Sequence, residues 1–195
     1  MSEALSEQVY EIGGKWLRIE GQKVEWENSL LTSSVEQPNE MRFGVAPIRL
    51  EHWAIGTKFM IELRRDGGKA LQIPIKYYFG IGRTKKVALY RELVDLFIDN
   101  FMDDAWALSL HRWESGETLY VGKFVVDAKG VCKQYGTHKT FIAFEEMQVV
   151  ERMGHLLINS KNDPKRYMKL EFLKDWNWPL VELALMKKMI WKPSQ

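Results

Sequence analysis

The segment whose residues are best suited to bind a ligand is a glycine-rich turn with the sequence FGIGRTKK. In this segment two glycines precede a predicted helix and three cations follow. Backbone amides at a helix N-terminus, together with the positive end of the helix dipole, attract anions. The spacing matches neither the phosphate-binding loop nor the dinucleotide fingerprint. The segment predicts an anion site, although a solvated strand-to-helix turn explains the same residues. Its candidate ligand-binding residues are Gly80, Gly82, Arg83, Lys85 and Lys86.

Two more groups of cations fall at predicted hairpin tips. Arg64 and Arg65 flank an Asp-Gly-Gly turn in the first half of the chain, and Lys165 and Arg166 occupy the corresponding turn in the second half. Basic tips of this kind can contact an anionic membrane surface or nucleic acid. Stacking of bases would need aromatic residues between the cations, and only Tyr167 lies close in sequence. The alternative explanation is that these residues are charged only because hairpin tips are exposed to solvent.

Tryptophan is frequent, with eight residues in the chain. Core anchoring accounts for most of them. An exposed aromatic patch that docks a partner is the alternative. The candidates for such a patch flank predicted helix ends and are Trp106, Trp113 and Trp191.

Residues for catalysis or metal binding show no suitable pattern. The four histidines lack ligand spacing, and the single cysteine, Cys132, excludes a multi-cysteine metal site. Cys132 and His138 lie across a predicted turn rather than side by side, and a thiol nucleophile would need a base within hydrogen-bond reach. The paired carboxylates at 103–104 and 145–146 point in different directions along a helix or strand. The sequence therefore predicts no catalytic residue, no metal, no cofactor and no enzyme.

Composition limits the classes of partner. The chain has 195 residues, 46% of them hydrophobic, which is enough for a substantial core. A formal net charge of +2 gives no strong nucleic-acid signal. The first residues carry neither a basic start nor an apolar run, and no stretch is apolar enough to be a transmembrane segment. We expect a cytoplasmic protein.

The elements before the predicted helix are short strands. Alternating apolar and polar residues predict a half-buried antiparallel meander with glycine in its turns. The predicted strands of this meander are 9–12, 15–20 and 23–27.

A second group of strands follows a stretch rich in Ser, Thr, Pro and Asn. This stretch, 28–39, is expected to be a long loop. Residues 43–53 predict one strand, which Pro47 places at a sheet edge or a bend. Residues 59–63 and 70–75 predict a hairpin across the Asp-Gly-Gly turn.

Apolar residues then recur at three- and four-residue steps over 87–101, the spacing of one helical face. Thr84 is the predicted N-cap. The pair Asp103-Asp104 could cap a second helical piece, which Gly116 would end in the left-handed conformation. Two helices and one bent helix both fit this pattern.

From Glu117 the pattern starts again. ETLYVGKFVVDAKGVCKQY resembles QVYEIGGKWLRIEGQKVEWEN, and TFIAFEEMQVVERMGHLLIN resembles FGVAPIRLEHWAIGTKFMIEL. YMKLEFL then stands where ALQIPI stood, and WNWPLVELALMKKMI stands where the central helix stood. Asp175 or Asn177 can cap this last helix, and Pro179 suits its first turn. The order of elements indicates a diverged duplication.

Several strands followed by one helix, twice over, resembles the pleckstrin-homology-like (PH-like) family, most clearly over 167–189. The resemblance implies an α+β fold of two units, 1–116 with its helical connector and 117–195. Each unit would be a bent antiparallel sheet, or partly open barrel, capped by a C-terminal helix. Lipid-binding members of that family carry basic residues in the first hairpin turn, where this chain has only Lys23 in the first copy and, in the second, Lys123 and Lys129.

Because that family is mostly non-catalytic, the resemblance implies a binding scaffold. We therefore expect a non-enzymatic binding or adaptor protein whose partner is another protein or a second copy of the chain. The alternative is a peripheral binder of anionic membrane lipid, or of another anionic ligand, through the basic hairpin tips and the glycine-rich turn.

Overall fold

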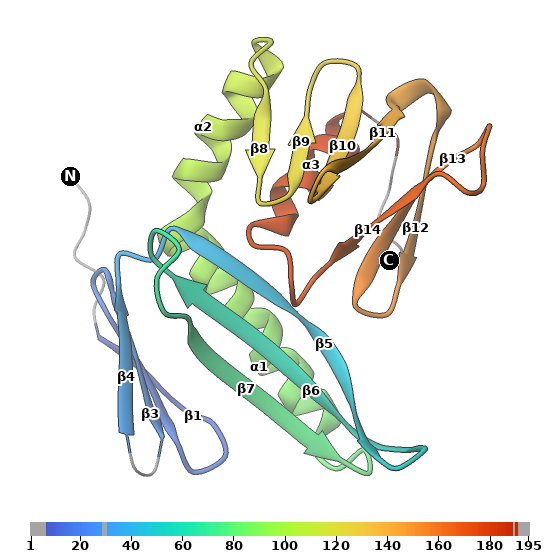
Figure 1. The fold of residues 1–195 in the computed structure, drawn as a ribbon. Coiled ribbons are helices and arrows are strands. Elements are labelled where there is room, and N and C mark those ends of the chain that lie inside the picture. Colours follow the sequence, from blue (N-terminus) through green and yellow to red (C-terminus); the bar gives the residue numbers. More distant parts are fainter. Residues whose placement is uncertain (1–6, 29–30, 189, 191–195) are drawn as a thin grey trace. The chain divides into compact units, whose positions relative to one another are not determined.

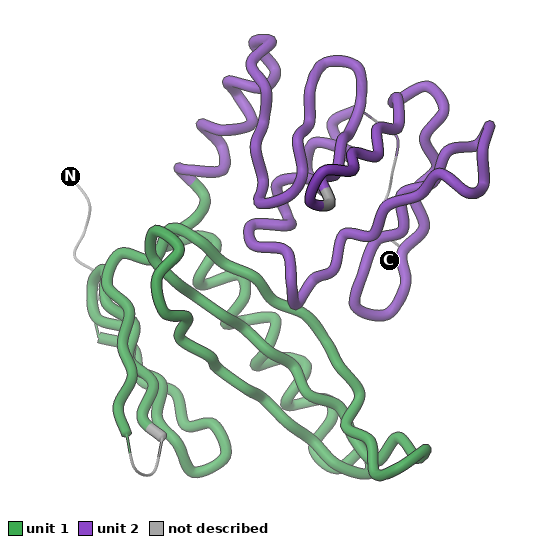
Figure 2. The backbone as a smooth tube through the Cα atoms, viewed as in Figure 1, with its two compact units in different colours: residues 1–103 green, residues 104–195 purple. Residues whose placement is uncertain are grey.

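The computed structural model describes residues 7–28, 31–188 and 190. The chain divides into two compact units, residues 1–103 and residues 104–195 (Figure 2). Both units consist of antiparallel sheets with helices, which is the α+β class expected from the sequence (Figure 1). The boundary between the units falls between Asp103 and Asp104, whereas the predicted first unit extends to Gly116.

The first unit begins with a four-stranded antiparallel meander. The three predicted strands are confirmed, and each pairs with the next one along the chain. The expected long loop over 28–39 is wrong, because Leu31–Glu36 forms a fourth strand; residues 29–30 lie outside the described residues. The polar residues of this strand face solvent while Val35 is buried opposite Val24, so one apolar residue is enough to anchor the strand. The strands are β1 (Gln8–Glu11), β2 (Trp16–Glu20), β3 (Lys23–Asn28) and β4 (Leu31–Glu36).

A three-stranded sheet follows, made of β5 (Glu40–Leu50), β6 (Trp53–Arg64) and β7 (Leu71–Tyr78). The hairpin from β6 to β7 is confirmed, and Pro47 lies on β5, an edge strand, as predicted. The single strand expected over 43–53 is wrong, because β5 and β6 form a hairpin that turns at Glu51 and His52. No glycine, proline or asparagine marks this turn; Glu51 itself takes the left-handed conformation, with φ of 52°.

The helical region begins with α1 (Arg83–Phe97), passes through a π-helical segment, η1 (Ile98–Met102), and continues as α2 (Asp103–Glu114). The predicted N-cap, Thr84, is wrong. Gly82 takes this position with φ of 69°, a conformation that glycine adopts without a steric penalty. Gly116 follows α2 with φ of 101°, confirming the predicted terminator.

One face of the β5–β6–β7 sheet is buried against α1 (Figure 1). The ring of Phe59 stacks on that of Tyr90 at a centroid distance of 4.7 Å, and Ile61, Ile73 and Ile75 on the same face are fully buried. Because successive side chains of a strand point to opposite faces, the residues between these isoleucines face away from α1. That second face carries the candidate site.

The second unit has the same order of elements: a four-stranded meander, a three-stranded meander and a helix. Asn177 is the N-cap of the final helix and Pro179 lies in its first turn, as predicted. The elements are β8 (Leu119–Val121), β9 (Phe124–Val126), β10 (Gly130–Tyr135), β11 (His138–Ala143), η2 (Phe144–Glu146), β12 (Met147–Arg152), β13 (His155–Ser160), β14 (Tyr167–Glu171) and α3 (Trp178–Lys187).

Within the described ranges, none of the helices combines the length and the hydropathy needed to cross a membrane.

Candidate functional site

An open groove of about 600 Å³ lies in the first unit, between β3–β4 and β6–β7. We call it the lysine groove. Its apolar floor includes side chains that are almost fully buried, among them Met60 and Trp26 at 6% and 5% exposure. Its cations come from four separate parts of the unit. The groove is lined by Lys15, Lys58, Lys69 and Lys76, together with Trp26, Met60 and Pro74.

Two of these lysines face each other across neighbouring strands. Lys58 on β6 is the direct register partner of Lys76 on β7, and on the other side Lys58 pairs with Ala46. Like charges placed directly opposite each other on a sheet destabilise it. The sheet therefore carries a local repulsion that none of these pairings relieves.

Among the described residues, no carboxylate compensates for the charge of the groove lysines. The described residues that line the groove include no aspartate or glutamate. Within the described part of the chain, no ion pair involves any of the four lysines. A nearby acid on the sheet, Glu62, is buried and already paired with Arg42, and it accepts a hydrogen bond of 2.7 Å from Gln72. The groove therefore presents concentrated positive charge.

A smaller hollow of about 170 Å³ extends the groove toward α1. It shares Lys15, Pro74 and Lys76 with the groove and adds Lys86. The structure thus brings one residue of the predicted glycine-rich anion site to the lysine groove. Gly80, Gly82, Arg83 and Lys85 line neither hollow.

The predicted basic hairpin tip of the first unit lies at the other end of the sheet. Arg64 ends β6, whereas Gly80 follows the end of β7, and the two strands are antiparallel. The basic hairpin tip and the glycine-rich turn therefore lie at opposite ends of the β6–β7 pair. Arg64 also forms a two-pronged ion pair with Glu40, at 2.7 and 2.9 Å, and Arg65 pairs with Asp66 at 3.3 Å.

The corresponding tip of the second unit is similar. Arg166 pairs with Glu146 at 2.9 Å, and Glu146 also accepts a hydrogen bond of 3.0 Å from Ser160. Lys165 is exposed, and its backbone amide donates to the carboxylate of Asp163. The arginine of this tip therefore holds the hairpin together and is only partly available to a ligand.

The predicted docking tryptophans that the structure describes are buried. Trp106 and Trp113 are each 5% exposed. Trp113 packs edge-on against Phe144, and its indole N–H donates to the backbone carbonyl of Asp127 at 3.4 Å. Neither ring presents a surface to a partner. Trp191 lies outside the described residues.

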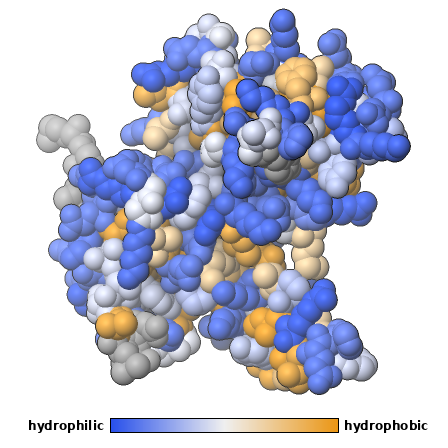
Figure 3. All heavy atoms as spheres, in the orientation of Figure 1, coloured by the Kyte–Doolittle hydropathy of each residue, from blue (hydrophilic) through white to orange (hydrophobic). Residues whose placement is uncertain are grey.

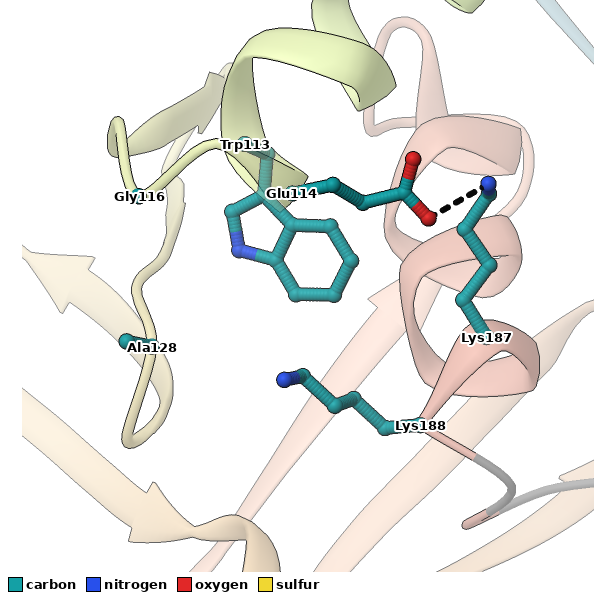
Figure 4. Close-up of a pocket in the computed structure, with 6 residues that line it drawn as sticks. All are labelled: Trp113, Glu114, Gly116, Ala128, Lys187 and Lys188. Atoms are coloured by element: carbon teal, nitrogen blue, oxygen red, sulfur yellow. Dashed lines mark hydrogen bonds and ion pairs between the residues drawn. The ribbon is translucent and has the colours of Figure 1, made fainter.

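A small hollow of about 180 Å³ adjoins Trp113 in the second unit (Figure 4). The ammonium of Lys188 lies 5.3 Å from the centre of the Trp113 ring, a favourable cation–π arrangement. On the same rim, Lys187 pairs with Glu114 at 2.6 Å. Because the cations here are already engaged, this hollow is a weaker anion site than the lysine groove.

The described residues offer little for catalysis. No group of three His, Cys, Asp or Glu side chains within them could hold a metal ion. Cys132 is a half-buried free thiol on β10. What the groove can do chemically is attract and hold negative charge.

Sequence reasoning missed Lys15, Lys58 and Lys76, which are far apart in the chain and come together only when β7 packs beside the first sheet. A signal did exist, because Lys58 and Lys76 both occupy the polar phase of an alternating strand. Finding the pair would have required the register between β6 and β7.

Fold and site together define an α+β protein of antiparallel sheets with a cationic groove. Comparison of the chain with protein-family models, curated proteins and solved structures finds no match.

Proposed function

We propose that this chain is a non-enzymatic binding protein that holds a multiply charged anion in the lysine groove. The observation that carries the proposal is the direct pairing of Lys58 with Lys76 on a face where the described residues offer no carboxylate to either one. An anion placed between the two ammonium groups would turn a repulsion into two charge-assisted hydrogen bonds.

The shape of the groove supports a ligand with several negative groups. Lys15 and Lys69 come from outside the paired strands, so the four lysines reach the groove from four separate segments of the chain. The floor itself is apolar, which suits a ligand with a ring or a short carbon skeleton between its charges. Phosphorylated polyols and acidic peptides both have this chemistry.

The fold supports a scaffold of the PH-like kind. Within the described residues, each unit has seven strands in a four-plus-three arrangement, followed by a helix. We propose on this basis that the two units are diverged PH-like copies and that ligand binding is their task. In this arrangement the first unit carries the ligand site.

Isothermal titration calorimetry on the full chain tests the proposal, with myo-inositol hexakisphosphate and a tetraglutamate peptide as probes. The test variant is Lys58→Gln/Lys76→Gln. We expect at least a tenfold loss of affinity, equivalent to about 1.4 kcal/mol, because two charge-assisted contacts are removed. A matched control is Lys161→Gln/Lys165→Gln, which removes two exposed charges from the second unit.

Affinity of the wild-type chain should also fall as salt is added, because the contacts are ionic. Absence of binding for both probes at low ionic strength would contradict the proposal. So would equal affinity of the groove variant and the control variant.

A further inference from the structure

The end of the β5–β6–β7 sheet that lies opposite the Arg64–Arg65 hairpin tip exposes large apolar side chains to solvent. We call this end the apolar tip and define it by Leu50, Trp53, Phe79 and Ile81, which are 64%, 76%, 75% and 78% exposed. Figure 3 shows hydrophobic atoms among hydrophilic ones over this end of the unit. Four large apolar residues gathered at one end differ from the single exposed apolar residues that are common on protein surfaces.

The hydrogen bonds of the sheet bring the two parts of the tip together. Leu50 pairs with Trp53 across the β5–β6 turn. The amide of Phe79, just after β7, donates to the carbonyl of Ile55 at 2.8 Å. The β5–β6 hairpin and the glycine-rich turn therefore form one surface.

Gly56 makes this close arrangement feasible. A Cβ atom at this position would lie 2.3 Å from the carbonyl oxygen of Tyr77, a distance at which the backbone would have to move. The register of β5 and β6 also shifts beside it, between Ile48 and Arg49, which is the irregularity of a β-bulge. Both features position the end of β7 against the hairpin.

The exposed conformation is held by strained backbone. Glu51 and Phe79 have φ of 52° and 51°, in the left-handed region that non-glycine residues rarely adopt. An aromatic residue kept in this region and also left exposed is unfavourable for the isolated chain. Strain of this kind concentrates at functional sites.

The charges around the tip are predominantly positive. The segments 49–54 and 78–86 contain the cations Arg49, Arg83, Lys85 and Lys86 and a single carboxylate, Glu51. Within the described part of the chain, none of these cations forms an ion pair. The tip therefore combines exposed apolar side chains with a basic surround.

We infer that the apolar tip docks on the surface of an anionic lipid bilayer. Trp53, Phe79 and Ile81 would enter the interface between headgroups and acyl chains, where apolar and aromatic side chains are favourable. Arg49, Arg83 and Lys85 would then contact the anionic headgroups. Charge complementarity selects this occupant, because an apolar protein surface would leave the cations without counter-charges. The inference does not depend on a ligand in the lysine groove.

Co-sedimentation of the full chain with vesicles tests the inference. The vesicles contain phosphatidylcholine alone, or three parts phosphatidylcholine to one part phosphatidylserine. We expect the wild-type chain to bind the anionic vesicles at low salt. Trp53→Ser/Phe79→Ser should weaken binding at least tenfold, and Arg83→Gln/Lys85→Gln should weaken it by a similar factor on anionic vesicles only.

A matched control is Tyr120→Ser/Met153→Ser, because these residues of the second unit are 74% and 77% exposed and lie outside the tip. This variant should bind like wild type. The four serine and glutamine substitutions in the tip affect exposed side chains, and circular dichroism checks that the fold is kept.

Three results would overturn the inference. The first is a wild-type chain that stays in solution with anionic vesicles at low salt. The second is retained sedimentation of Trp53→Ser/Phe79→Ser together with loss for Lys58→Gln/Lys76→Gln, which would assign the membrane to the lysine groove. The third is a wild-type dimer in sedimentation velocity that Trp53→Ser/Phe79→Ser converts to a monomer, which would assign the tip to a second copy.

Discussion

The two units share an order of elements, but they differ in whether the connection between the last strand and the helix exposes its aromatic residue or packs it. In the first unit this connection exposes Phe79 and Ile81. In the second unit the corresponding connection turns its aromatic residue inward, and Phe172 stacks on Trp178 at a centroid distance of 4.2 Å. The second unit therefore shows that the same connection can be closed. The open form in the first unit is not required by the topology.

The lysines show a similar difference, because the second unit pairs a buried lysine with a carboxylate and the first unit leaves its groove lysines without one among the described residues. In the second unit Lys133 is 3% exposed, lies 3.4 Å from a carboxylate oxygen of Asp175 and donates to the backbone carbonyl of Lys169. Burial lowers the pKa of Lys133, and the nearby Asp175 opposes that shift. The second unit thus supplies its own partner for an interior cation, whereas the groove lysines of the first unit face open space.

The hairpin tips, by contrast, are alike in both units. Arg64 pairs with Glu40 in the first, and Arg166 pairs with Glu146 in the second. A feature that both units keep and neutralise internally is better explained by hairpin stability than by ligand binding. The lysine groove and the apolar tip of the first unit are therefore better candidates for functional surfaces than the hairpin tips.

The largest effect is expected for Asp175→Ala. The substitution removes the carboxylate that faces Lys133 and accepts a hydrogen bond of 2.8 Å from the amide of Glu171. Breaking one side of a buried ion pair destabilises a protein by about 3–5 kcal/mol. Urea unfolding followed by circular dichroism measures the change.

The matched control in the first unit is Lys76→Ala. Because this lysine is exposed and faces Lys58, its removal should change the free energy of unfolding by less than about 0.5 kcal/mol. Equal losses for the two variants would show that the groove lysines are structural and would break the comparison.

A smaller effect is expected for the aromatic residues of the two connections. Phe172→Ala removes the ring stacked on Trp178 and should lower the free energy of unfolding by about 2 kcal/mol, since Phe172 is partly buried. Phe79→Ala should change it by less than about 0.5 kcal/mol. Thermal unfolding of both variants measures the two losses of unfolding free energy, which can then be compared. A large loss for Phe79→Ala would mean that the apolar tip is part of a core.

The smallest effect is a pH dependence that belongs to the second unit. Burial, with a contribution from Glu151, raises the pKa of Glu182 on α3 to about 7. The folded state then holds this proton more tightly than the unfolded state does. Stability from this group is therefore full below the unfolded pKa and is lost as the pH rises from about 4.5 through 7.

Glu182→Gln should remove this pH dependence and stabilise the fold at pH 8 by about 1–2 kcal/mol. Unfolding curves at pH 5 and pH 8 for wild type and variant measure the difference. The same slope in both proteins would place the responsible group elsewhere.

The sequence predicted elements well where one periodicity dominated. Alternation in WLRIE and KVEWE gave the first meander, and the three-to-four spacing from Val87 gave the central helix. Failures came where backbone conformation overrode composition. Glu51 turns the chain without a turn-forming residue, and the polar stretch after Asn28 is held as a strand by its pairing with β3.

The candidate site was less predictable. The glycine-rich turn was found from local spacing, but Lys58 and Lys76 meet only through strand register, and Lys15 joins them through packing of β7 beside the first sheet. The exposure of individual tryptophans could not be predicted from the sequence either. Trp53 and Trp113 both lie at an end of a regular element, yet one is 76% exposed and the other 5%.

The prolines of the first unit have a consequence for aggregation. Both edges of the three-stranded sheet carry one, Pro47 on β5 and Pro74 on β7. Proline has no N–H to offer to an incoming strand, so each edge resists growth by addition of another chain. The apolar tip exposes several large apolar side chains at one end of this sheet. Because the adjoining sheet edges cannot readily pair with another chain, association through the tip is less able to lead to a fibril.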